Sequence, residues 1–443
     1  MKIAVVGGGL AGLSVAWRLR QRHDVVVFES AGSVGGNVRS QRYGEYVFDL
    51  GPNGYMSNAT QIAQLVDETG LRERAVSAQA AAKRYIYWNE RLHPVPVKPP
   101  QALATQLVSP LGKLAALRDL FVRPVAAAVP NKSVDAFFTR HFGREVAERI
   151  VATALLGITG GDSKRTSVAA LFPRLIELER ARGSILRASA SGDRTPATLT
   201  SFPNGMGELT GALAAGLGPV VRTIGGTHAV AAIARDGAGW RVRTGDANEA
   251  SFDAAVLAMP AYAAAELLGP LDNELSELLR GIPYAPMRVC GIAFRKADVT
   301  ASLDGFGFLA ARNQNVRILG ALYTSSLFRE QAPPDIAYLR AFLGGTFDAA
   351  SGAGNADATQ ALVRADLQRV LGIDAPVQQW HEITWERAIP QYALDHVERV
   401  RAVDARTQAL PNLWLTGNAY RGVGITDVVR DAFAVAERLS GAS

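Results

Sequence analysis

The sequence predicts an α/β protein of two or three domains, one of them built on a doubly wound parallel sheet. Three observations lead to this fold class: a glycine-rich turn directly after the first strand, helical periodicity between residues 101 and 187, and a second strand-rich block from about residue 287 to 384. The chain has 443 residues, more than one hydrophobic core usually supports, so several domains are expected.

The N-terminal segment has the layout of a dinucleotide-binding unit. A strand over residues 2–6 runs into GGGLAG at residues 7–12, and a second strand over residues 25–28 ends in Glu29. In such a unit Gly7 permits the tight turn, Gly9 lets the backbone approach a pyrophosphate, and Gly12 allows close packing of helix on strand. Glu29 would accept hydrogen bonds from the ribose hydroxyls. The combination predicts a bound dinucleotide.

The uncharged run after Lys2, residues 3–17, superficially resembles a signal peptide. Glycines interrupt the run, no small-residue cleavage site precedes Arg18, and cleavage would destroy the nucleotide fold. We therefore expect a cytoplasmic protein. No apolar stretch reaches the roughly 18 residues that cross a bilayer, so a spanning helix is not expected, while attachment to the inner membrane surface stays open.

Cysteine and histidine usage argues against disulfides and metal. Cys290 is the single cysteine and lies in an apolar run, which favours a small core residue. The histidines show no ligand spacing, so we expect no structural metal. They are His23, His93, His141, His228, His381 and His396.

Positive charge is concentrated in one segment. Residues 81–185 carry sixteen Lys and Arg against eight acids, a local net charge of +8, whereas the whole chain has +6. A solvated helical surface, an anionic substrate and an anionic membrane face all remain open as explanations. Nucleic acid is not expected as a partner, because no aromatic residues interleave with the cations.

The elements follow in order along the chain. A helix capped by Asn58 and ended by Gly70 precedes a hairpin that opens at Arg84 and turns at residues 89–90. The proline-rich residues 94–100 mark a boundary, helical periodicity covers 137–156 and 168–178, and residues 189–196 are typical of a flexible surface loop.

The C-terminal half is predicted to alternate strands with a few helices. A hairpin over residues 229–244 turns at 236–237, residues 254–258 form a buried strand, and residues 356–371 form a helix. The last strand, residues 413–416, leads through a glycine turn into a helix that ends near Leu439. A second glycine turn at a helix N-terminus suggests that both chain ends converge on one long cofactor, which favours FAD over NAD.

Several motifs, in order along nearly the whole chain, resemble the amine-oxidase-like flavoprotein superfamily. They are GGNVRS at 35–40, GP at 51–52, FPNGM at 202–206 and GNAYRGVG at 417–424. Within that superfamily, DGFGFL at 304–309, AIPQY at 388–392 with His396, and residues 167–173 resemble oxygen-dependent, FAD-containing protoporphyrinogen oxidases.

The resemblance implies an α/β fold in which a doubly wound FAD-binding domain is combined with a mixed-sheet substrate domain and an all-helical insertion. Its FAD-binding domain would consist of residues 1–80, 201–286 and 386–443, and its substrate domain of 81–97 and 287–385. Residues 98–200 would form the helical domain, which associates with membranes in this family.

The resemblance also assigns cofactor residues. A helix N-terminus at residues 422–425 would lie beside the pyrimidine ring of the flavin, where its dipole stabilises negative charge. The residues expected to contact FAD are Gly7, Gly9, Leu10, Ala11, Gly12, Glu29, Ser30, Gly35, Gly36, Arg39, Gly51, Pro52, Asn53, Val230, Gly417, Asn418, Gly422, Val423, Gly424 and Ile425.

For the substrate, Arg84 matches the family arginine that binds a propionate, and an apolar set matches the residues that hold the macrocycle. The apolar set is Phe306, Gly307, Leu309, Leu322 and Phe342. A tetrapyrrole is a large apolar disc with carboxylates at its edge, so it needs apolar walls and a cation at the rim. Leu322 and Phe342 could equally be core residues, and Arg84 a surface arginine.

The reaction that the resemblance implies is the oxidation of protoporphyrinogen IX to protoporphyrin IX in haem biosynthesis. It proceeds in three two-electron steps, each passing a hydride to the flavin, which dioxygen reoxidises with release of hydrogen peroxide. We assign no catalytic side chain, because no triad or carboxylate pair is evident and the cofactor carries the chemistry.

Three alternatives remain open. An amine oxidase would keep a lysine near the flavin, but no lysine occurs between Arg165 and Arg295 and Lys296 ends its strand. Coproporphyrinogen III, with four propionates, is a second substrate, to which the basic segment gives some support. A non-catalytic flavin-binding protein is the third alternative. Oligomerisation is compatible with all of these interpretations.

Overall fold

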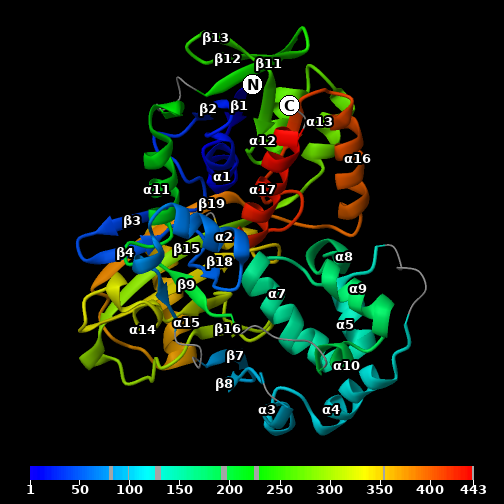
Figure 1. Cartoon of the computed structure of the whole chain (residues 1–443). Coiled ribbons are helices and arrows are strands. Elements are labelled where there is room, and N and C mark those ends of the chain that lie inside the picture. Colours follow the sequence, from blue (N-terminus) through cyan, green and yellow to red (C-terminus); the bar gives the residue numbers. More distant parts are fainter. Residues whose placement is uncertain are drawn as a thin grey trace. The chain divides into compact units, whose positions relative to one another are not determined.

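The computed structural model describes residues 1–78, 83–97, 99–124, 131–190, 197–223, 229–352 and 355–441 (Figure 1). By its contacts the chain divides into two compact units. Unit 1 comprises Met1–Ser77, Ala197–Pro283 and Val397–Ser443, and unit 2 comprises Ala78–Pro196 and Tyr284–His396. The expected α/β class, with a doubly wound domain, a mixed sheet and a helical insertion, is confirmed. The residue boundaries of three separate domains stay predictions.

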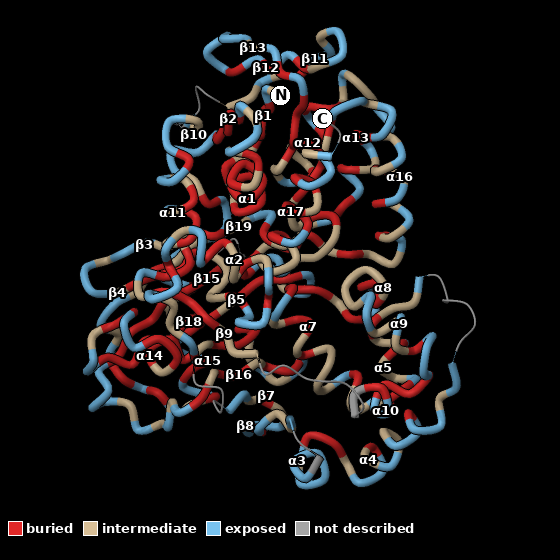
Figure 2. The backbone as a smooth tube through the Cα atoms, viewed as in Figure 1, coloured by how far each residue is buried: buried red, intermediate tan, exposed pale blue. Residues whose placement is uncertain are grey.

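Unit 1 is built on a five-stranded parallel sheet in the order β10-β2-β1-β14-β20. Helix α1 is buried along nearly its whole length because it packs against this sheet and against α17 (Figure 2). The strands of this sheet are β1 Lys2–Val6, β2 Asp24–Glu29, β10 Val221–Thr223, β14 Ala254–Leu257 and β20 Leu413–Leu415. The helices of unit 1 are α1 Leu10–Leu19, α2 Thr60–Glu68, α11 Gly207–Leu217, α12 Ala261–Leu268, α13 Asn273–Arg280, α16 His396–Gln408 and α17 Ile425–Gly441. The first residue of α16 is assigned to unit 2.

Three smaller sheets complete unit 1. One contains β11 Val230–Asp236, β12 Gly239–Thr244 and β13 Glu249–Phe252; another pairs β3 Ser40–Tyr43 with β4 Tyr46–Asp49; the third joins β5 Tyr55–Met56, β9 Leu199–Ser201 and β6 Val76–Ser77. The hairpin turn at residues 237–238 confirms the prediction for this segment, since Gly237 takes a left-handed φ of 59°.

Unit 2 contains a seven-stranded mixed sheet in the order β19-β15-β18-β17-β16-β7-β8, in which only β16 and β7 are parallel among the described pairs. One face packs on α15, which supplies Val363 and Leu367 to the core there. The strands are β7 Arg84–Trp88, β8 Arg91–Pro94, β15 Tyr284–Arg295, β16 Gly307–Ala310, β17 Gly320–Leu322, β18 Ile336–Gly344 and β19 Gln379–Pro390, and the helices near them are α14 Thr324–Leu327 and α15 Ala356–Leu371.

The helical part of unit 2 also bears out the periodicity in the sequence. Its elements are α3 Pro99–Ala104, α4 Pro110–Ala116, η2 Leu117–Phe121, α5 Val134–Phe142, α6 Arg144–Val146, the π-helical η3 Ala147–Val151, α7 Ala152–Thr159, α8 Val168–Leu171, α9 Pro173–Arg182 and α10 Ile185–Ala190. The predicted helix over 137–156 is broken at Gly143, whose φ of 81° ends α5. Of the predicted loop 189–196, residues 191–196 lie outside the described residues.

One predicted helix cap is wrong. The N-cap of α2 is Ala59, which has no side-chain cap, and not Asn58. The reason is that β5 pairs with β9 and the chain then turns, with the amide of Ala59 donating to the carbonyl of Met56 at 3.0 Å. Only after that turn can the helix begin.

Cys290 is fully buried in β15, which confirms the core assignment, and burial raises the pKa of its thiol. None of the described helices is long and apolar enough to span a bilayer. Within the same residues no group of three or more Asp, Glu, His or Cys side chains is arranged to hold a metal ion.

Candidate functional site

The carboxyl ends of the parallel strands in unit 1 meet at one edge. Val6 at the end of β1 pairs with Phe28 of β2 and with Leu257 of β14, and Leu257 pairs with Leu415 of β20. The residues that follow these strands are therefore neighbours: the turn at 7–12, Glu29, and the turn that begins at Thr416. Ligands of open α/β sheets bind at this carboxyl edge.

The glycines of the first turn differ in the space around them. A Cβ at Gly12 would lie 1.9 Å from the carbonyl oxygen of Gly7, and a Cβ at Gly7 would lie 2.8 Å from that of Ala258, so neither position admits a side chain. A Cβ at Gly9 would meet nothing nearer than 3.9 Å. Gly7 and Gly12 thus shape the turn, whereas Gly9 could carry a methyl group at ordinary van der Waals distance from Gly36.

Helix α1 begins at Leu10 directly after this turn. Its N-cap, Gly9, has no side chain, so no protein side chain caps the first amide groups of Leu10 and Ala11. A helix N-terminus with such amides binds phosphate through hydrogen bonds and the helix dipole. The backbone at Gly9, which carries no side chain, and the uncapped helix end together fit a pyrophosphate.

Glu29 fastens the turn to the end of β2. Its Oε2 accepts from the amide of Gly8 at 2.7 Å, and its Oε1 accepts from the amide of Ala31 at 2.8 Å and from the hydroxyl of Ser30 at 3.3 Å. A carboxylate has about four lone-pair sites. The carboxylate therefore keeps capacity for ribose hydroxyls while it positions the turn.

A second segment adjoins the first turn. Gly35 forms a parallel bridge with Gly9 and donates to the carbonyl of Gly8 at 2.8 Å, and Arg39 donates through Nε to the carbonyl of Gly36 at 2.8 Å. The backbone at Gly51 packs so closely that a Cβ would lie 2.2 Å from the carbonyl oxygen of Asn37. Pro52 and Asn53 follow Gly51 in the chain. Most of the predicted N-terminal cofactor residues thus gather near one turn.

The second predicted cofactor turn lies between β20 and α17. Gly417 and Gly422 take left-handed φ angles of 131° and 136°, and no atom lies within 4 Å of a Cβ built at Gly417. Asn418, Val423 and Gly424 complete the turn, and Ile425 begins α17. Val230 is separate from this edge, since it begins β11 of the small antiparallel sheet.

In unit 2 the structure brings five of the predicted substrate residues, all except Phe306, onto one face of the mixed sheet. Arg84 in β7 pairs with Gly307 in β16, and Gly307 pairs with Leu322 in β17. In the next row on the same face, Leu309 pairs with Gly320, and Gly320 pairs with Phe342. Paired residues of neighbouring strands point to the same face. We call this set the substrate face.

Two glycines of the substrate face lie close against the neighbouring strand. Gly307 separates Arg84 from Leu322, and Gly320 separates Leu309 from Phe342. A Cβ would lie 2.1 Å from the carbonyl oxygen of Ala321 at Gly307, and 2.3 Å from that of Phe308 at Gly320. The strands therefore approach each other at positions without a side chain.

Arg84 is exposed at the beginning of β7, and its guanidinium lies 4.6 Å from the ring centre of Phe306. Phe306 itself is fixed through its backbone, whose amide donates to the carbonyl of Lys83 at 2.7 Å. A guanidinium over an aromatic ring is oriented by the quadrupole of the ring. Phe306 thus contacts Arg84 and orients its guanidinium at the edge of the substrate face.

Helix α7 covers part of the substrate face. A Cβ at Gly157 of α7 would lie 2.3 Å from Cδ2 of Leu309, so the helix crosses the strand at a residue without a side chain. Leu156 of the same helix packs with Met287 and Phe342. The opposite face of the sheet is filled by the core on α15.

Two buried arginines in this sheet were not predicted as functional. Arg340 of β18 pairs with Leu322 and lies on the substrate face, 1% exposed, with its guanidinium 5.8 Å from the Phe342 ring centre. Arg288 of β15 points to the α15 side, where its Nε donates to Thr384 at 2.9 Å and it also bonds Thr359. A charged residue within an apolar strand was the available signal.

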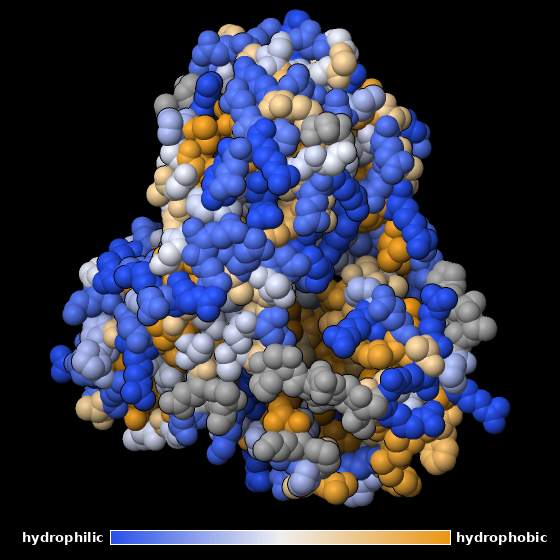
Figure 3. All heavy atoms as spheres, in the orientation of Figure 1, coloured by the Kyte–Doolittle hydropathy of each residue, from blue (hydrophilic) through white to orange (hydrophobic). Residues whose placement is uncertain are grey.

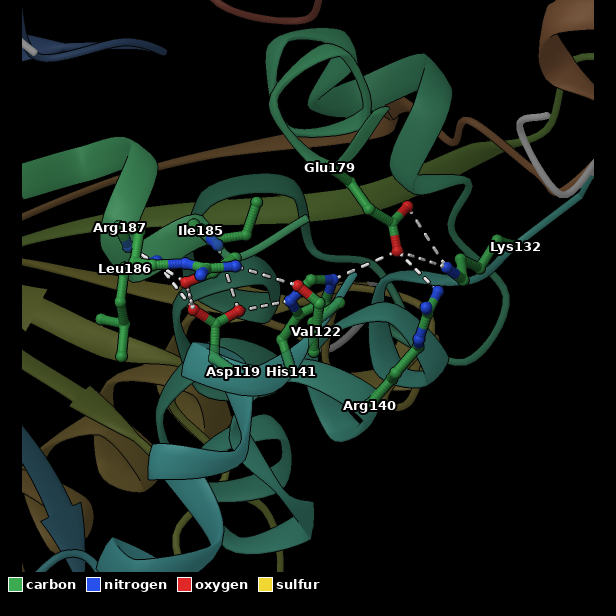
Figure 4. Close-up of polar contacts among 10 residues, drawn as sticks. Asp119, Val122, Lys132, Arg140, His141, Glu179, Ile185, Leu186 and Arg187 are labelled. Carbon is green, nitrogen blue, oxygen red and sulfur yellow. Dashed lines mark hydrogen bonds and ion pairs between the residues drawn. The ribbon is translucent and has the colours of Figure 1, made fainter. Parts of the chain in front are cut away.

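A buried ionic network occupies the helical part of unit 2 (Figure 4). His141 lies between Asp119, 2.5 Å from its Nδ1, and Glu179, 3.2 Å from its Nε2. Lys132 and Arg140 also bind Glu179, at 3.1 and 2.7 Å. Asp119 further accepts from Ser184, Ile185 and Leu186 at the start of α10. Part of the local positive charge is therefore paired internally.

Hydrogen bonding changes the acidity of both carboxyls. Burial alone would raise the pKa of Asp119, but hydrogen bonds from Ser184, Leu186, His141 and Ile185 outweigh burial and lower that pKa. Burial would also raise the pKa of Glu179. The hydrogen bonds from Lys132 and His141 and the charges of Lys132 and Arg140 outweigh burial, so the pKa of Glu179 is lowered. Both groups are thus held ionised.

A parallel sheet with a glycine turn, a fitting acid and a second glycine turn at its carboxyl edge defines a dinucleotide-binding oxidoreductase fold. Comparison with known families identifies the family to which the chain belongs. The family model of the flavin-containing amine oxidoreductases matches residues 10–440, and the chain belongs to that family. Its cofactor is FAD, which the geometry beside Gly9 and Glu29 fits.

Similar proteins bear out the resemblance in the sequence. Protoporphyrinogen oxidase 1 of Spinacia oleracea chloroplasts is 29% identical, over 97% of this chain and 82% of that protein. Coproporphyrinogen III oxidase of Staphylococcus aureus is 25% identical, over 99% of this chain and 98% of that protein. The crystal structure of a candidate protoporphyrinogen oxidase of Exiguobacterium sp. 255-15 has a TM-score of 0.85 at 22% identity, covering 100% of this chain and 99% of that one.

Proposed function

We propose that this flavoprotein oxidises protoporphyrinogen IX to protoporphyrin IX, with dioxygen as acceptor and hydrogen peroxide as by-product, in haem biosynthesis. The observation that carries the proposal is the substrate face, on which Arg84 lies at the beginning of β7 in a sheet that presents Leu309, Leu322 and Phe342 on the same side. The names of the spinach and rice relatives, at 29% and 28% identity, support the same substrate class.

In this proposal the residues bind and orient, and FAD, when bound, supplies the hydride acceptor. Leu309, Leu322 and Phe342 provide a wall for the tetrapyrrole ring, and α7 excludes water from part of that wall. Arg84 would hold a propionate by two parallel hydrogen bonds, a geometry that a planar guanidinium offers.

Coproporphyrinogen III is a second candidate substrate, favoured by Arg340. Three strand spacings separate Arg84 from Arg340 along one row, which is about 14 Å at the usual distance between strands. Coproporphyrinogen III has propionates at opposite edges of the ring, whereas protoporphyrinogen IX has both at one edge. A positive charge at each end of this row suits the former; because Arg340 is buried, its charge acts in this proposal by attracting the second pair of propionates. The Staphylococcus aureus relative, named for coproporphyrinogen III, is consistent with this choice.

The deciding experiment supplies each porphyrinogen separately to the purified, FAD-loaded protein. Porphyrin fluorescence and oxygen consumption are followed together, and protein stripped of FAD measures spontaneous oxidation. We expect catalysed porphyrin formation with one oxygen consumed per two-electron step, and kcat/KM ranks the two substrates. Catalysis of neither reaction would refute both proposals and leave an amine oxidase or a non-catalytic flavoprotein.

We further propose that the helical part of unit 2 attaches the protein to the anionic inner face of a membrane. Apolar side chains on α3, α4 and η2 are strongly exposed, with Leu111 at 79% and Phe121 at 82% (Figure 3). This α3–η2 surface consists of Leu103, Leu111, Leu114, Leu117, Leu120 and Phe121. Exposed Arg118 and Arg123 adjoin it. Apolar side chains among cations are typical of binding to anionic lipid surfaces.

Vesicle sedimentation tests the membrane proposal. The protein should bind vesicles that contain anionic phosphatidylglycerol more tightly than neutral ones, and salt should weaken binding by screening. Because each large apolar side chain contributes about 1.5 to 3 kcal/mol on burial, a double variant with Leu111→Ser and Phe121→Ser should lose at least about tenfold in affinity. Met56→Ser, at an exposed apolar residue of unit 1, is the control. Equal binding by all three proteins would reject the proposal.

A further inference from the structure

The turn between β20 and α17, residues 416–424, is held in shape by charged side chains that the cofactor assignment does not include. Five of the residues expected to contact FAD lie in it. Its glycines at 417 and 422 take left-handed φ angles, and its central residues Ala419 and Tyr420 are buried. Arg421 is the single charged residue of the turn.

Asp431 of α17 binds two residues of this turn, Thr416 and Arg421. Its Oδ2 accepts from the hydroxyl of Thr416 at 2.7 Å, and its Oδ1 accepts from Arg421 at 3.2 Å. Asp431 is 8% exposed and Thr416 is fully buried. A buried carboxylate that binds two partners with different oxygens fixes the distance between them.

Arg421 extends the network to another helix. Its second terminal nitrogen donates to Asp404 of α16 while the first binds Asp431 of α17. The planar guanidinium thus joins two helices across the turn that it belongs to. The positive φ angles of the flanking glycines do not by themselves fix the shape of the turn, because glycine adopts such angles readily. The ion pairs of Arg421 are therefore restraints on the shape of the turn.

We propose that Arg421 is a positioning residue for FAD, whose ion pairs with Asp404 and Asp431 hold the turn 416–424 in the shape that binds the cofactor. The proposal rests on the assignment of this turn to FAD. It is independent of which substrate the protein oxidises, since cofactor affinity can be measured without substrate.

The test is FAD binding to apoprotein, followed by quenching of flavin fluorescence. A partly exposed arginine that bridges two carboxylates contributes modestly, so Arg421→Ala should raise the Kd for FAD by about three- to thirtyfold. Arg421→Lys should recover part of the loss, because an ammonium can keep one ion pair. The visible circular dichroism of bound flavin should also change in Arg421→Ala, since that signal reports how the ring is held.

Arg406 provides a matched control. It lies on α16 and, like Arg421, bridges two carboxylates, Asp272 at 2.8 Å and Glu274 at 2.5 Å. Its side chain is 37% exposed against 32% for Arg421. Arg406→Ala should lower thermal stability and leave the Kd for FAD unchanged. If Arg421→Ala fails to fold, Asp404→Asn removes one of the two ion pairs and should give a smaller rise in Kd. Parent-like FAD affinity in the Arg421 or Asp404 variant, or equal loss in Arg406→Ala, would overturn the proposal.

Discussion

Arg84 and Arg340 stand in the same cross-strand row of the mixed sheet, separated only by Gly307 and Leu322. The first is exposed and the second is 1% exposed, so the two cations have different environments. A buried cation is costly unless other groups compensate for its charge. The row therefore contains an accessible cation, Arg84, which can bind a substrate carboxylate. It also contains a buried cation, Arg340, whose charge contributes to the electrostatic potential at the substrate face.

Arg84→Ala should lower kcat/KM for a porphyrinogen by roughly ten- to a hundredfold, because a lost hydrogen bond to a charged group costs about 1.5 to 3 kcal/mol. FAD content and thermal stability should not change. Arg84→Lys should recover part of the loss. The control is Arg91→Ala, an exposed arginine in the paired strand of the same hairpin. If Arg84→Ala turns over like the parent, another cation binds the propionate.

Arg340→Met keeps much of the side-chain volume and removes the charge. We expect kcat/KM for coproporphyrinogen III to fall by about tenfold or more and that for protoporphyrinogen IX to fall less, because only the former has carboxylates at both edges. Arg288→Met is the matched control, since Arg288 is equally buried but lies on the opposite face. It should affect stability and leave the ratio of the two kcat/KM values unchanged. An unchanged ratio in Arg340→Met would contradict this role.

Gly9 and Gly12 of the first turn should respond differently to alanine. Gly9→Ala has room in the folded protein, so it should fold normally and bind FAD weakly, because the methyl group enters the space left for the pyrophosphate. Gly12→Ala would place a methyl group 1.9 Å from the carbonyl of Gly7 and should impair folding itself. Gly32→Ala, where nothing lies within 4 Å, is the neutral control. Flavin absorbance per chain and thermal unfolding separate these outcomes. Normal FAD content in Gly9→Ala would contradict the assignment of Gly9 to the pyrophosphate site.

Much of the fold could be predicted because its signals are local. The strand, turn and acid at 2–29, the hairpin at 84–94 and the helix at 356–371 each depend on residues close in the sequence. The substrate face is different, since its rows join four strands far apart in the chain. Its residues were predicted from a family resemblance, and only the strand register shows that they share a face.

Other features depend on contacts that the sequence does not reveal. Because β5 pairs with β9, the N-cap of α2 is Ala59 and not the predicted Asn58. Helices α12, α13 and α16 were not predicted, and Arg421 was read as part of a glycine motif. Its two carboxylates come from positions 10 and 17 residues away. Likewise, the sequence shows the local net charge of +8 but does not show that Lys132 and Arg140 of this segment are paired with Glu179.

The network around His141 predicts how stability depends on pH. Because the pKa values of Asp119 and Glu179 are lowered in the folded protein, the stabilisation that they provide is complete above their unfolded values, about pH 4. It is lost as the pH falls below about 4 through the folded values. Asp119→Asn removes the charge of a buried carboxylate that accepts hydrogen bonds from Ser184, Ile185 and Leu186, and it should cost about 1.5 to 3 kcal/mol at pH 7. The difference from the parent should shrink below pH 4, where the parent also becomes protonated. Urea unfolding between pH 7 and 3 measures both effects, with Glu177→Gln, an exposed acid on α9, as control. A difference between parent and Asp119→Asn that stays constant down to pH 3 would show that the carboxylate charge is not what stabilises the network.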